Sequence, residues 1–441
     1  MKKIMLALSC ALATSFAMAQ SVSTVVHPAW SKNAAIYEAN IRQFSAEGSF
    51  KKFEGYLPEL KKMGVGIIWI MPINPIGKVN RKGTLGSYYS VADYTAVNPE
   101  FGTPEDFHHL VDAIHAQGMK VIIDWVANHT AWDHPWVKEH PDYYVHDAKG
   151  QFVAPVPDWF DVIKLDYSNP QLRKEMISAL SYWVTNYDLD GFRCDVAAMV
   201  PTDFWNEARQ QLDKIKPVFM LAEAVEPDLQ EHAFDMTYGW QFKDIFGEIA
   251  KGKKNAADMA AYLHTDDTTY NPNSYRMLHT SNHDLNSWEG TEFVRLGDAV
   301  ETFLVLSNTL KGMPLLYEGQ EAGNTKALDF FERDPIVWKD HPYKALYTKL
   351  FHLKQTNHAL WNGLDGGQPQ MIKTSDDEHI FAFVRSKDQD QIVGIFNLSD
   401  KPRTFSSTDP ALKGTFINPL DGQPTVVPQE LKAWEYKLLV K

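Results

Sequence analysis

Arg193 and Asp195 are the clearest candidates for chemistry in this chain. They lie in residues 190–195 (DGFRCD), and the chain continues apolar to Val200, which is typical of a buried strand. Because side chains alternate faces along a strand, we expect these two to point the same way. A guanidinium beside a carboxylate keeps it ionised at neutral pH, and such a carboxylate can act as a nucleophile. For these two residues alone, a structural ion pair is the alternative interpretation.

Three further strand-like runs also end in polar residues. His129 follows residues 119–126, Glu223 follows residues 218–222, and His283 and Asp284 follow residues 275–280. In a barrel of parallel strands, these ends would meet on one rim. Buried carboxylates are costly unless they are paired or used in chemistry. Four polar strand ends therefore indicate a functional site rather than four unrelated helix caps.

Paired carboxylates with imidazoles and an arginine are suited to glycosyl transfer. That reaction needs one carboxylate as nucleophile and another held protonated as acid. Arg193 supports Asp195 in the first role. The apolar neighbours of Glu223 are expected to raise its pKa and suit it to donate a proton. Spacing does not give the separation of the carboxylates, so retention and inversion of configuration both stay open.

The elements that must position these residues follow an alternating pattern. Eight strand-like runs alternate with helical ones between residues 35 and 354, which predicts an α/β fold, a (β/α)₈ TIM barrel. One helix is expected from Phe50 to Lys62. Another is expected to begin with Thr103 as its cap, Pro104 in its first turn and Asp106 in support. The expected strands are residues 35–41, 65–72, 119–126, about 190–195, 218–222, 233–238, 275–280 and 313–317.

Two segments depart from this alternation. Residues 129–166 are rich in Trp, His, Pro and Asp, and we interpret them as an excursion after strand three. After residue 360 the runs become short and alternating, which predicts a C-terminal antiparallel β domain. We therefore predict a catalytic barrel over residues 20–360 and a β-sandwich over residues 361–441.

Residues 1–19 have the pattern of a secretory signal peptide. Two lysines precede an apolar stretch and a small-residue cleavage site, so the mature chain is expected to begin near Gln20. Cys10 leaves a lipid anchor as an alternative, although it lies early in the apolar stretch. No later segment has the roughly 20 uninterrupted apolar residues of a membrane helix. We expect an exported protein, periplasmic or secreted, that is not an integral membrane protein.

Charge narrows the classes of partner. The formal net charge of −13 argues against nucleic acid, whose phosphates need a basic face. The same charge is compatible with a neutral substrate such as sugar. The oligomeric state stays open.

The four strand ends resemble, in order and spacing, the four signature regions of the α-amylase superfamily, glycoside hydrolase family 13. The matching segments are residues 124–129, residues 191–195, Glu223 and residues 282–284. The family's Tyr-x-Val-x-Asp-Tyr motif is similar to residues 89–94 (YSVADY). The resemblance implies retention through a double displacement, with Asp195 as nucleophile and Glu223 as acid and base.

The resemblance also implies roles for five further residues. Asp284 would stabilise the transition state, and Arg193 would hold Asp195 charged. The sugar would contact Tyr89 by stacking, and His129 and His283 by hydrogen bonds. Strict alternation along the strand would turn His283 away from Asp284, so its role needs a bend at the strand end.

Departures from the family pattern bear on metal binding and specificity. Lys164 stands where the family commonly has an aspartate that helps Asn128 to bind calcium, and its charge would repel Ca²⁺. We therefore expect no metal ligands and no cofactor for the chemistry, and a structural Ca²⁺ is disfavoured. Met199 replaces a histidine usual in amylases, and Val196 occurs in members that accept α-1,6 links, so the linkage stays open.

The leading hypothesis is an α-amylase-like hydrolase of α-1,4 links in starch fragments or maltooligosaccharides. Alternatives on the same scaffold are an α-glucosidase, a cyclomaltodextrinase or neopullulanase-like enzyme, and a glucanotransferase. A non-catalytic glycan-binding relative is disfavoured because all three carboxylates are present. Endo or exo action stays open. At least one aromatic residue of the excursion is expected to line the cleft, the candidates being Trp132, Trp136, Trp159 and Phe160.

Overall fold

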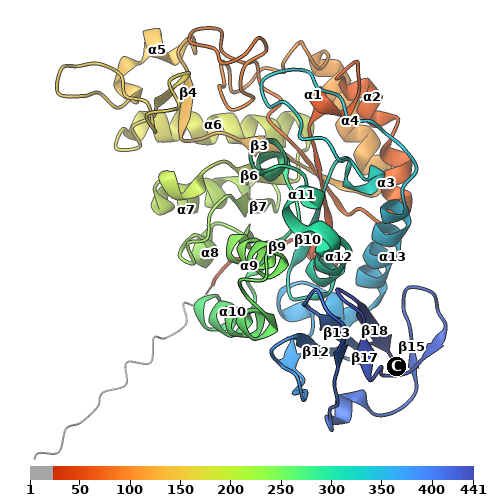
Figure 1. Ribbon diagram of the computed structural model, residues 1–441. Helices are drawn as coiled ribbons and strands as arrows, with labels where there is room; N and C mark the ends of the chain where they lie inside the picture. The colour runs from red at the N-terminus through yellow and green to blue at the C-terminus, as the bar shows by residue number, and fades with distance from the viewer. Residues whose placement is uncertain (1–22) are drawn as a thin grey trace, which may run out of the picture.

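A closed barrel of eight parallel strands forms the centre of the molecule, and helices surround it (Figure 1). The computed structural model describes residues 23–441, so the signal peptide expected at residues 1–19 lies outside the described residues. The barrel confirms all eight expected strands. They are β1 (Ile36–Ala39), β2 (Ile67–Ile70), β3 (Lys120–Trp125), β6 (Gly191–Cys194), β7 (Phe219–Ala222), β8 (Met236–Tyr238), β9 (Tyr275–Leu278) and β10 (Met313–Tyr317).

Both faces of the barrel strands are buried, which explains why the sequence shows continuous apolar runs there. Ile67 and Trp69 of β2 belong to the cluster inside the barrel, which also contains alternate residues of β7 and β9. Their neighbours Ile68 and Ile70 belong to the larger cluster under the surrounding helices. Alternate residues of one strand therefore fill two different cores, as expected for parallel strands covered on both sides.

The surrounding helices follow the barrel strands in chain order. One expected boundary is wrong, because residues 50–62 form two short helices. Pro58 has no backbone N–H and its ring would clash with a carbonyl one turn earlier, so a single helix cannot run through. The helices are α1 (Ile41–Phe44), α2 (Phe50–Glu54), α3 (Leu57–Met63), α4 (Pro104–Ala116), α6 (Pro170–Tyr187), α7 (Thr202–Leu212), α8 (Leu229–His232), α9 (Trp240–Ala250), α10 (Ala256–Thr269), α11 (Glu292–Leu296), α12 (Val300–Thr309) and α13 (Pro342–Thr356).

The start of α4 is confirmed in detail. The Thr103 hydroxyl accepts a bond from the Asp106 N–H, and the Asp106 carboxylate accepts one from the Thr103 N–H. This reciprocal capping box satisfies two donors that the first turn would otherwise leave unpaired.

The excursion after β3 begins and ends in a small antiparallel ladder. Its strands are β4 (His129–Ala131) and β5 (Val162–Lys164), and the short helix α5 (Trp136–Glu139) lies between them. Figure 1 shows this excursion on the opposite side of the barrel from the C-terminal strands.

The C-terminal strands form a six-stranded antiparallel sheet. Its apolar residues fall into two clusters: one continues into the barrel's outer core, and the other includes Phe405 and Leu431 beside the ladder of β14 and β17. Both faces of the sheet are therefore largely covered. The six strands of the sheet are β11 (Gln370–Met371), β12 (Ile380–Lys387), β13 (Asp390–Asn397), β15 (Phe416–Ile417), β16 (Pro424–Thr425) and β18 (Tyr436–Val440), and the separate ladder consists of β14 (Arg403–Thr404) and β17 (Glu430–Leu431).

Within residues 23–441, no helix has both the length and the apolar character needed to cross a membrane.

Gly191 allows β6 and β7 to approach closely at the start of the strand that carries Arg193. It pairs with Phe219 and has a φ of +152°, a conformation that side chains other than glycine rarely adopt. A Cβ atom at this position would lie 1.9 Å from the Phe219 carbonyl oxygen. Only glycine fits here without displacing one of the two strands.

We expect Gly191→Ala to lower the free energy of unfolding by at least about 2 kcal/mol, because backbone must move in the barrel. Denaturant unfolding measures this change. Gly247→Ala is the matched control: no atom lies within 4 Å of the added Cβ in helix α9, so stability should hold or rise by up to about 1 kcal/mol. Equal behaviour of the two variants would contradict the steric explanation.

Candidate active site

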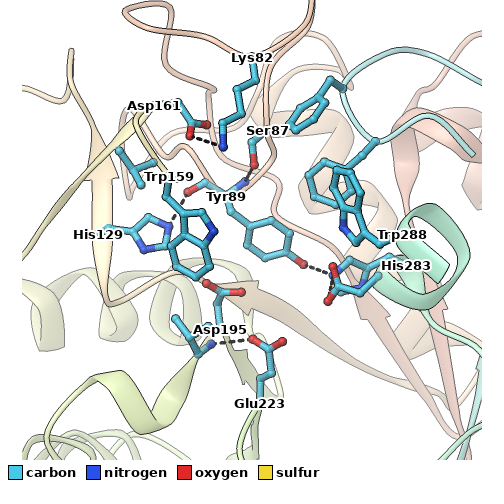
Figure 2. Close-up of a pocket in the computed structure, with 15 residues that line it drawn as sticks. Lys82, Ser87, Tyr89, His129, Trp159, Asp161, Asp195, Glu223, His283 and Trp288 are labelled. Atoms are coloured by element: carbon cyan, nitrogen blue, oxygen red, sulfur yellow. Dashed lines mark hydrogen bonds and ion pairs between the residues drawn. The ribbon is translucent and has the colours of Figure 1, made fainter. Parts of the chain in front are cut away.

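A pocket of about 230 Å³ opens at the C-terminal ends of the barrel strands (Figure 2). Six of the seven residues predicted from the sequence line it, and the seventh, Arg193, is fully buried in contact with two of them. Aromatic and charged residues from the loops complete the lining. The full lining is Lys82, Ser87, Tyr89, His129, Trp159, Asp161, Val162, Asp195, Val196, Glu223, His283, Asp284, Trp288, Phe330 and Phe331.

The Arg193 guanidinium is shared by three carboxylates. Its Nη1 donates to Asp124 Oδ1 at 2.8 Å and to Asp195 Oδ1 at 2.9 Å. Its Nη2 lies 3.0 Å from Glu223 Oε2. The expected common direction of Arg193 and Asp195 is thus confirmed. Asp124 is an additional partner, whose position at the end of β3 was the signal that could have identified it.

Asp195 is a buried carboxylate with opposing electrostatic influences. Burial raises its pKa, Arg193 lowers it, and Asp124 raises it again, with a net pKa of about 6. Asp195 is therefore mostly ionised at neutral pH. Arg193 stabilises that charge, as expected, but it does not offset burial completely.

Glu223 has a more strongly raised pKa, of about 8. Burial is the largest cause, Arg193 opposes it, and the carboxylates of Asp195 and Asp284 add to it. Glu223 is therefore mostly protonated at neutral pH, in agreement with its apolar neighbours in the sequence. Two carboxyl groups in one pocket thus differ in protonation, as acid and nucleophile require.

Val196 orients Glu223 through its backbone. The Val196 N–H donates to Glu223 Oε2 at 2.7 Å. Val196 has a φ of +36°, which is rare and strained for a β-branched residue. The strain lies directly after Asp195, and the turn it creates points the N–H at the carboxyl group of Glu223.

His283 is held in its charged form beside the pocket. Its Nδ1 donates to Glu38 Oε1 at 2.5 Å, and its Nε2 donates to the Tyr89 hydroxyl at 2.8 Å. Burial lowers its pKa, but the charges of Asp284 and Glu38 outweigh burial and raise the pKa to about 9. Glu38, the penultimate residue of β1, was not predicted; a carboxylate near the C-terminal end of a buried strand was the available signal.

Tyr89 connects this histidine to the carboxylates. Its hydroxyl donates to Asp124 Oδ2 at 3.0 Å, and its ring stacks against His283 with centroids 5.6 Å apart. The hydroxyl is therefore held by two hydrogen bonds, one to Asp124 and one from His283, and the ring lines the pocket.

His129 is neutral, unlike His283. Burial lowers its pKa to about 4. Its Nδ1 accepts from the Asn128 side chain at 3.2 Å, so its Nε2 carries the proton and lies 3.2 Å from the Tyr89 carbonyl oxygen. The neutral ring lines the pocket, and its one N–H is used by the Tyr89 backbone in this structure.

His283 and Asp284 can both face the pocket because β9 ends before them. Strict alternation would place His283 and Asp284 on opposite faces, but β9 ends at Leu278. Both residues lie beyond the pleated strand, and both line the pocket. The bend at the strand end is therefore confirmed.

Among the aromatic residues of the excursion, Trp159 lines the pocket. Trp136 packs against Tyr94 and Tyr143 instead, and Trp132 donates through its Nε1 to the Phe160 carbonyl oxygen. The pocket-lining Trp288, Phe330 and Phe331 were not predicted. They come from loops after β9 and β10, where no periodic pattern marks which side chains point inward.

The residue that stands opposite His129 is a cation and not a carboxylate. Lys164 is paired with His129 across the β4–β5 ladder, and the Asn128 side-chain NH2 donates to His129 Nδ1. Lys164 therefore brings a positive charge, and no oxygen ligand for Ca²⁺, to the strand pair beside Asn128. Over residues 23–441, no cluster of three or more His, Cys, Asp or Glu is arranged to hold a metal ion.

Comparison with known proteins agrees with this geometry. The family described as "Alpha amylase, catalytic domain" matches residues 45–161 and 158–392. The α-amylase MalA of Haloarcula japonica is 28% identical over 86% of this chain, which spans 57% of that protein's length.

Two solved structures share the fold over nearly their whole length. An α-amylase from Lactobacillus plantarum is 32% identical, with a TM-score of 0.84 over 93% of this chain and 99% of its own. A noncanonic maltogenic α-amylase, AmyB from Thermotoga neapolitana, is 30% identical, with a TM-score of 0.84 over 92% and 98% of the two chains. Because the family match covers most of the sequence, this chain belongs to the α-amylase family and is a glycoside hydrolase.

Proposed function

We propose that this protein hydrolyses α-1,4-linked glucans with retention of configuration. One observation carries the proposal: the Arg193 guanidinium contacts both Asp195 and Glu223. A single planar group holds the two carboxyl groups close together. Retaining enzymes need a separation of about 5–5.5 Å, whereas inverting enzymes leave more room for a water molecule.

In the first step the Asp195 carboxylate attacks the anomeric carbon. The bond from that carbon to the glycosidic oxygen breaks, and the oxygen takes the proton of Glu223. One Asp195 oxygen is bonded to Arg193, so the other is the attacking atom. The products of this step are a glycosyl ester on Asp195, an ionised Glu223 and the free leaving chain.

In the second step Glu223 takes a proton from water, and the water oxygen attacks the same carbon. The ester bond to Asp195 breaks, and both carboxyl groups return to their starting states. Two inversions at one carbon give retention.

The other pocket residues act on the sugar without exchanging protons. We assign Asp284 to the sugar hydroxyls and to the positive charge that develops on the ring. Tyr89 supplies a face for stacking. The Nε2–H groups of the protonated His283 and the neutral His129 are used by Tyr89 in this structure, and we propose that sugar hydroxyls share or replace these two bonds on binding.

Similarity also supports a narrower set of alternatives. Proteins named maltogenic α-amylase and cyclomaltodextrinase are 26% and 23% identical to this chain. Their catalytic step would be the same, and the products separate them from an α-amylase.

Nuclear magnetic resonance of the reaction with maltoheptaose tests the proposal. We expect the first products to be α-anomers, and Asp195→Asn to lower kcat at least about 1,000-fold, because the nucleophile is lost. Binding of maltooligosaccharide by the variant should stay within a few-fold. First products in the β configuration, or unchanged turnover by the variant, would refute the assigned mechanism.

The pH dependence of kcat/KM follows from the two pKa values. Activity should fall below about pH 6 as Asp195 gains a proton, and above about pH 8 as Glu223 loses one. Asp124→Asn removes a negative charge that raises the pKa of Asp195, so the acidic limb should move to lower pH. An acidic limb that stays in place in this variant would contradict the electrostatic assignment.

We also propose that no calcium ion is needed, with the Lys164 side chain taking its place. Addition of EDTA should leave the melting temperature unchanged. In the Lys164→Asp variant, added Ca²⁺ should raise the melting temperature, because the new carboxylate supplies a missing oxygen ligand. A large loss of melting temperature in EDTA for the unmodified protein would exclude this proposal.

We also propose that residues 1–19 act as a signal peptide and direct export of the protein. Cleavage after Ala19 would give a periplasmic or secreted enzyme with Gln20 at its N-terminus. The mass of the protein recovered from the periplasm or medium tests it, and an intact N-terminus would argue against it.

A further inference from the structure

Residues 78–87, which precede Tyr89, form a loop that we call the wall loop. In Figure 2 its residues Lys82 and Ser87 lie at one end of the pocket, Glu223 lies at the other, and Tyr89 stands between them. The wall loop is distinct from the strand ends that carry the carboxylates.

Lys82 attaches the wall loop to the excursion. Its Nζ donates to the Asp158 carbonyl oxygen at 2.7 Å and lies 3.1 Å from Asp161 Oδ1. It also lies 4.9 Å from the centre of the Phe160 ring. The Asp161 side chain is almost fully buried, so this ion pair is protected from solvent. One lysine therefore spans the gap between two segments that border the pocket.

The other side of the wall loop is attached to the segment before α13. The Thr84 N–H donates to Glu332 Oε1 at 2.7 Å, and the Thr84 hydroxyl also contacts Glu332. The Leu85 N–H donates to the Phe331 carbonyl oxygen at 3.2 Å. Gly83 lies so close to Phe331 that an added Cβ would be 2.5 Å from it.

The base of the wall loop is also fixed. The buried Arg42 donates through Nη1 to the Gly86 carbonyl oxygen at 2.9 Å. Arg81 donates to the carbonyl oxygens of Gly77 at 2.8 Å and Ile76 at 3.0 Å. Backbone and charged contacts on three sides therefore hold the wall loop between the excursion and the segment before α13.

The position of Glu223 defines which part of the substrate meets the wall loop. Glu223 must protonate the glycosidic oxygen, so the leaving chain lies on its side of the pocket. The remainder of the bound glucan, toward its non-reducing end, extends away from Glu223. That direction leads past Tyr89 to Lys82 and the wall loop.

We propose that the wall loop closes the non-reducing end of the cleft, so that this enzyme removes short fragments from chain ends and does not cut within chains. This inference rests on the proposed function and specifies its substrate: linear α-glucans with a free non-reducing end. Lys82 and Thr84 are specificity-determining residues because they hold the wall loop in place.

Maltoheptaose and maltoheptaose blocked with an ethylidene group on its non-reducing glucose separate the possibilities. We expect the blocked substrate to be cleaved at least about 100-fold more slowly, since the group cannot pass the wall loop. Products are followed by chromatography. Equal rates on both substrates would overturn the inference and leave the proposed function intact. Failure to cleave either would instead refute the proposed function.

Variants of the wall loop test the assigned cause. In Lys82→Ala/Thr84→Ala, and in a variant with residues 80–85 replaced by two glycines, the rate ratio of blocked to free substrate should rise at least about tenfold. Lys78→Ala, an exposed lysine of the same loop, is the matched control and should keep the original ratio. An unchanged ratio in the folded shortened variant would overturn the role of the wall loop.

Discussion

The buried guanidinium of Arg193 is the constraint on which the site depends. A charge with no solvent exposure must be paired, and Arg193 achieves this with Asp124, Asp195 and Glu223, while its Nε donates to Tyr238. Three carboxylates so close would repel one another without it. One cation does not offset the burial of three acids, so the pKa values of Asp124, Asp195 and Glu223 all stay above their usual range. The difference in pKa between the two reacting groups follows from this incomplete compensation.

The same balance extends outward to His283. Its positive charge faces Glu38 on one side and, through the Tyr89 hydroxyl, the carboxylates on the other. Tyr89 is thus part of the charge network as well as a wall for the sugar. A residue expected only to stack also sets the position of Asp124, which in turn affects the pKa of Asp195.

A different solution to burying charge appears where the C-terminal sheet meets the barrel. Arg385 of β12 is buried and donates to the carbonyl oxygens of Thr309, Leu310, Gly367 and Trp361. Dispersed carbonyl dipoles replace carboxylates here, and burial lowers the pKa of Arg385 to about 9. Carboxylates create reactive pairs of unequal protonation, whereas carbonyl groups simply fasten the sheet to the end of α12.

The sequence was sufficient where a residue's surroundings are fixed by its own strand. Eight apolar runs in the sequence correspond to the eight barrel strands. The rim residues Asp195, Glu223 and Asp284 could be predicted because each follows such a run. It was insufficient where partners come from distant segments. The contact of Glu38 with His283 spans 245 positions, and neither residue signals the other locally. Pro58 shows a third case, in which a local signal against one continuous helix over residues 50–62 was present in the sequence.

These differences explain why chemistry is easier to infer than substrate preference. The reacting groups are attached to strands, or to residues just beyond them, whose positions are set by the closed barrel. Lys82, Thr84 and Glu332 lie in loops, and their contacts join three segments far apart in the chain. Loop contacts of this kind change without disturbing the barrel core. The fold shared with the solved α-amylases therefore positions the carboxylates, while the proposed limit on the length of bound glucan depends on a few bonds that hold the wall loop at the non-reducing end of the cleft.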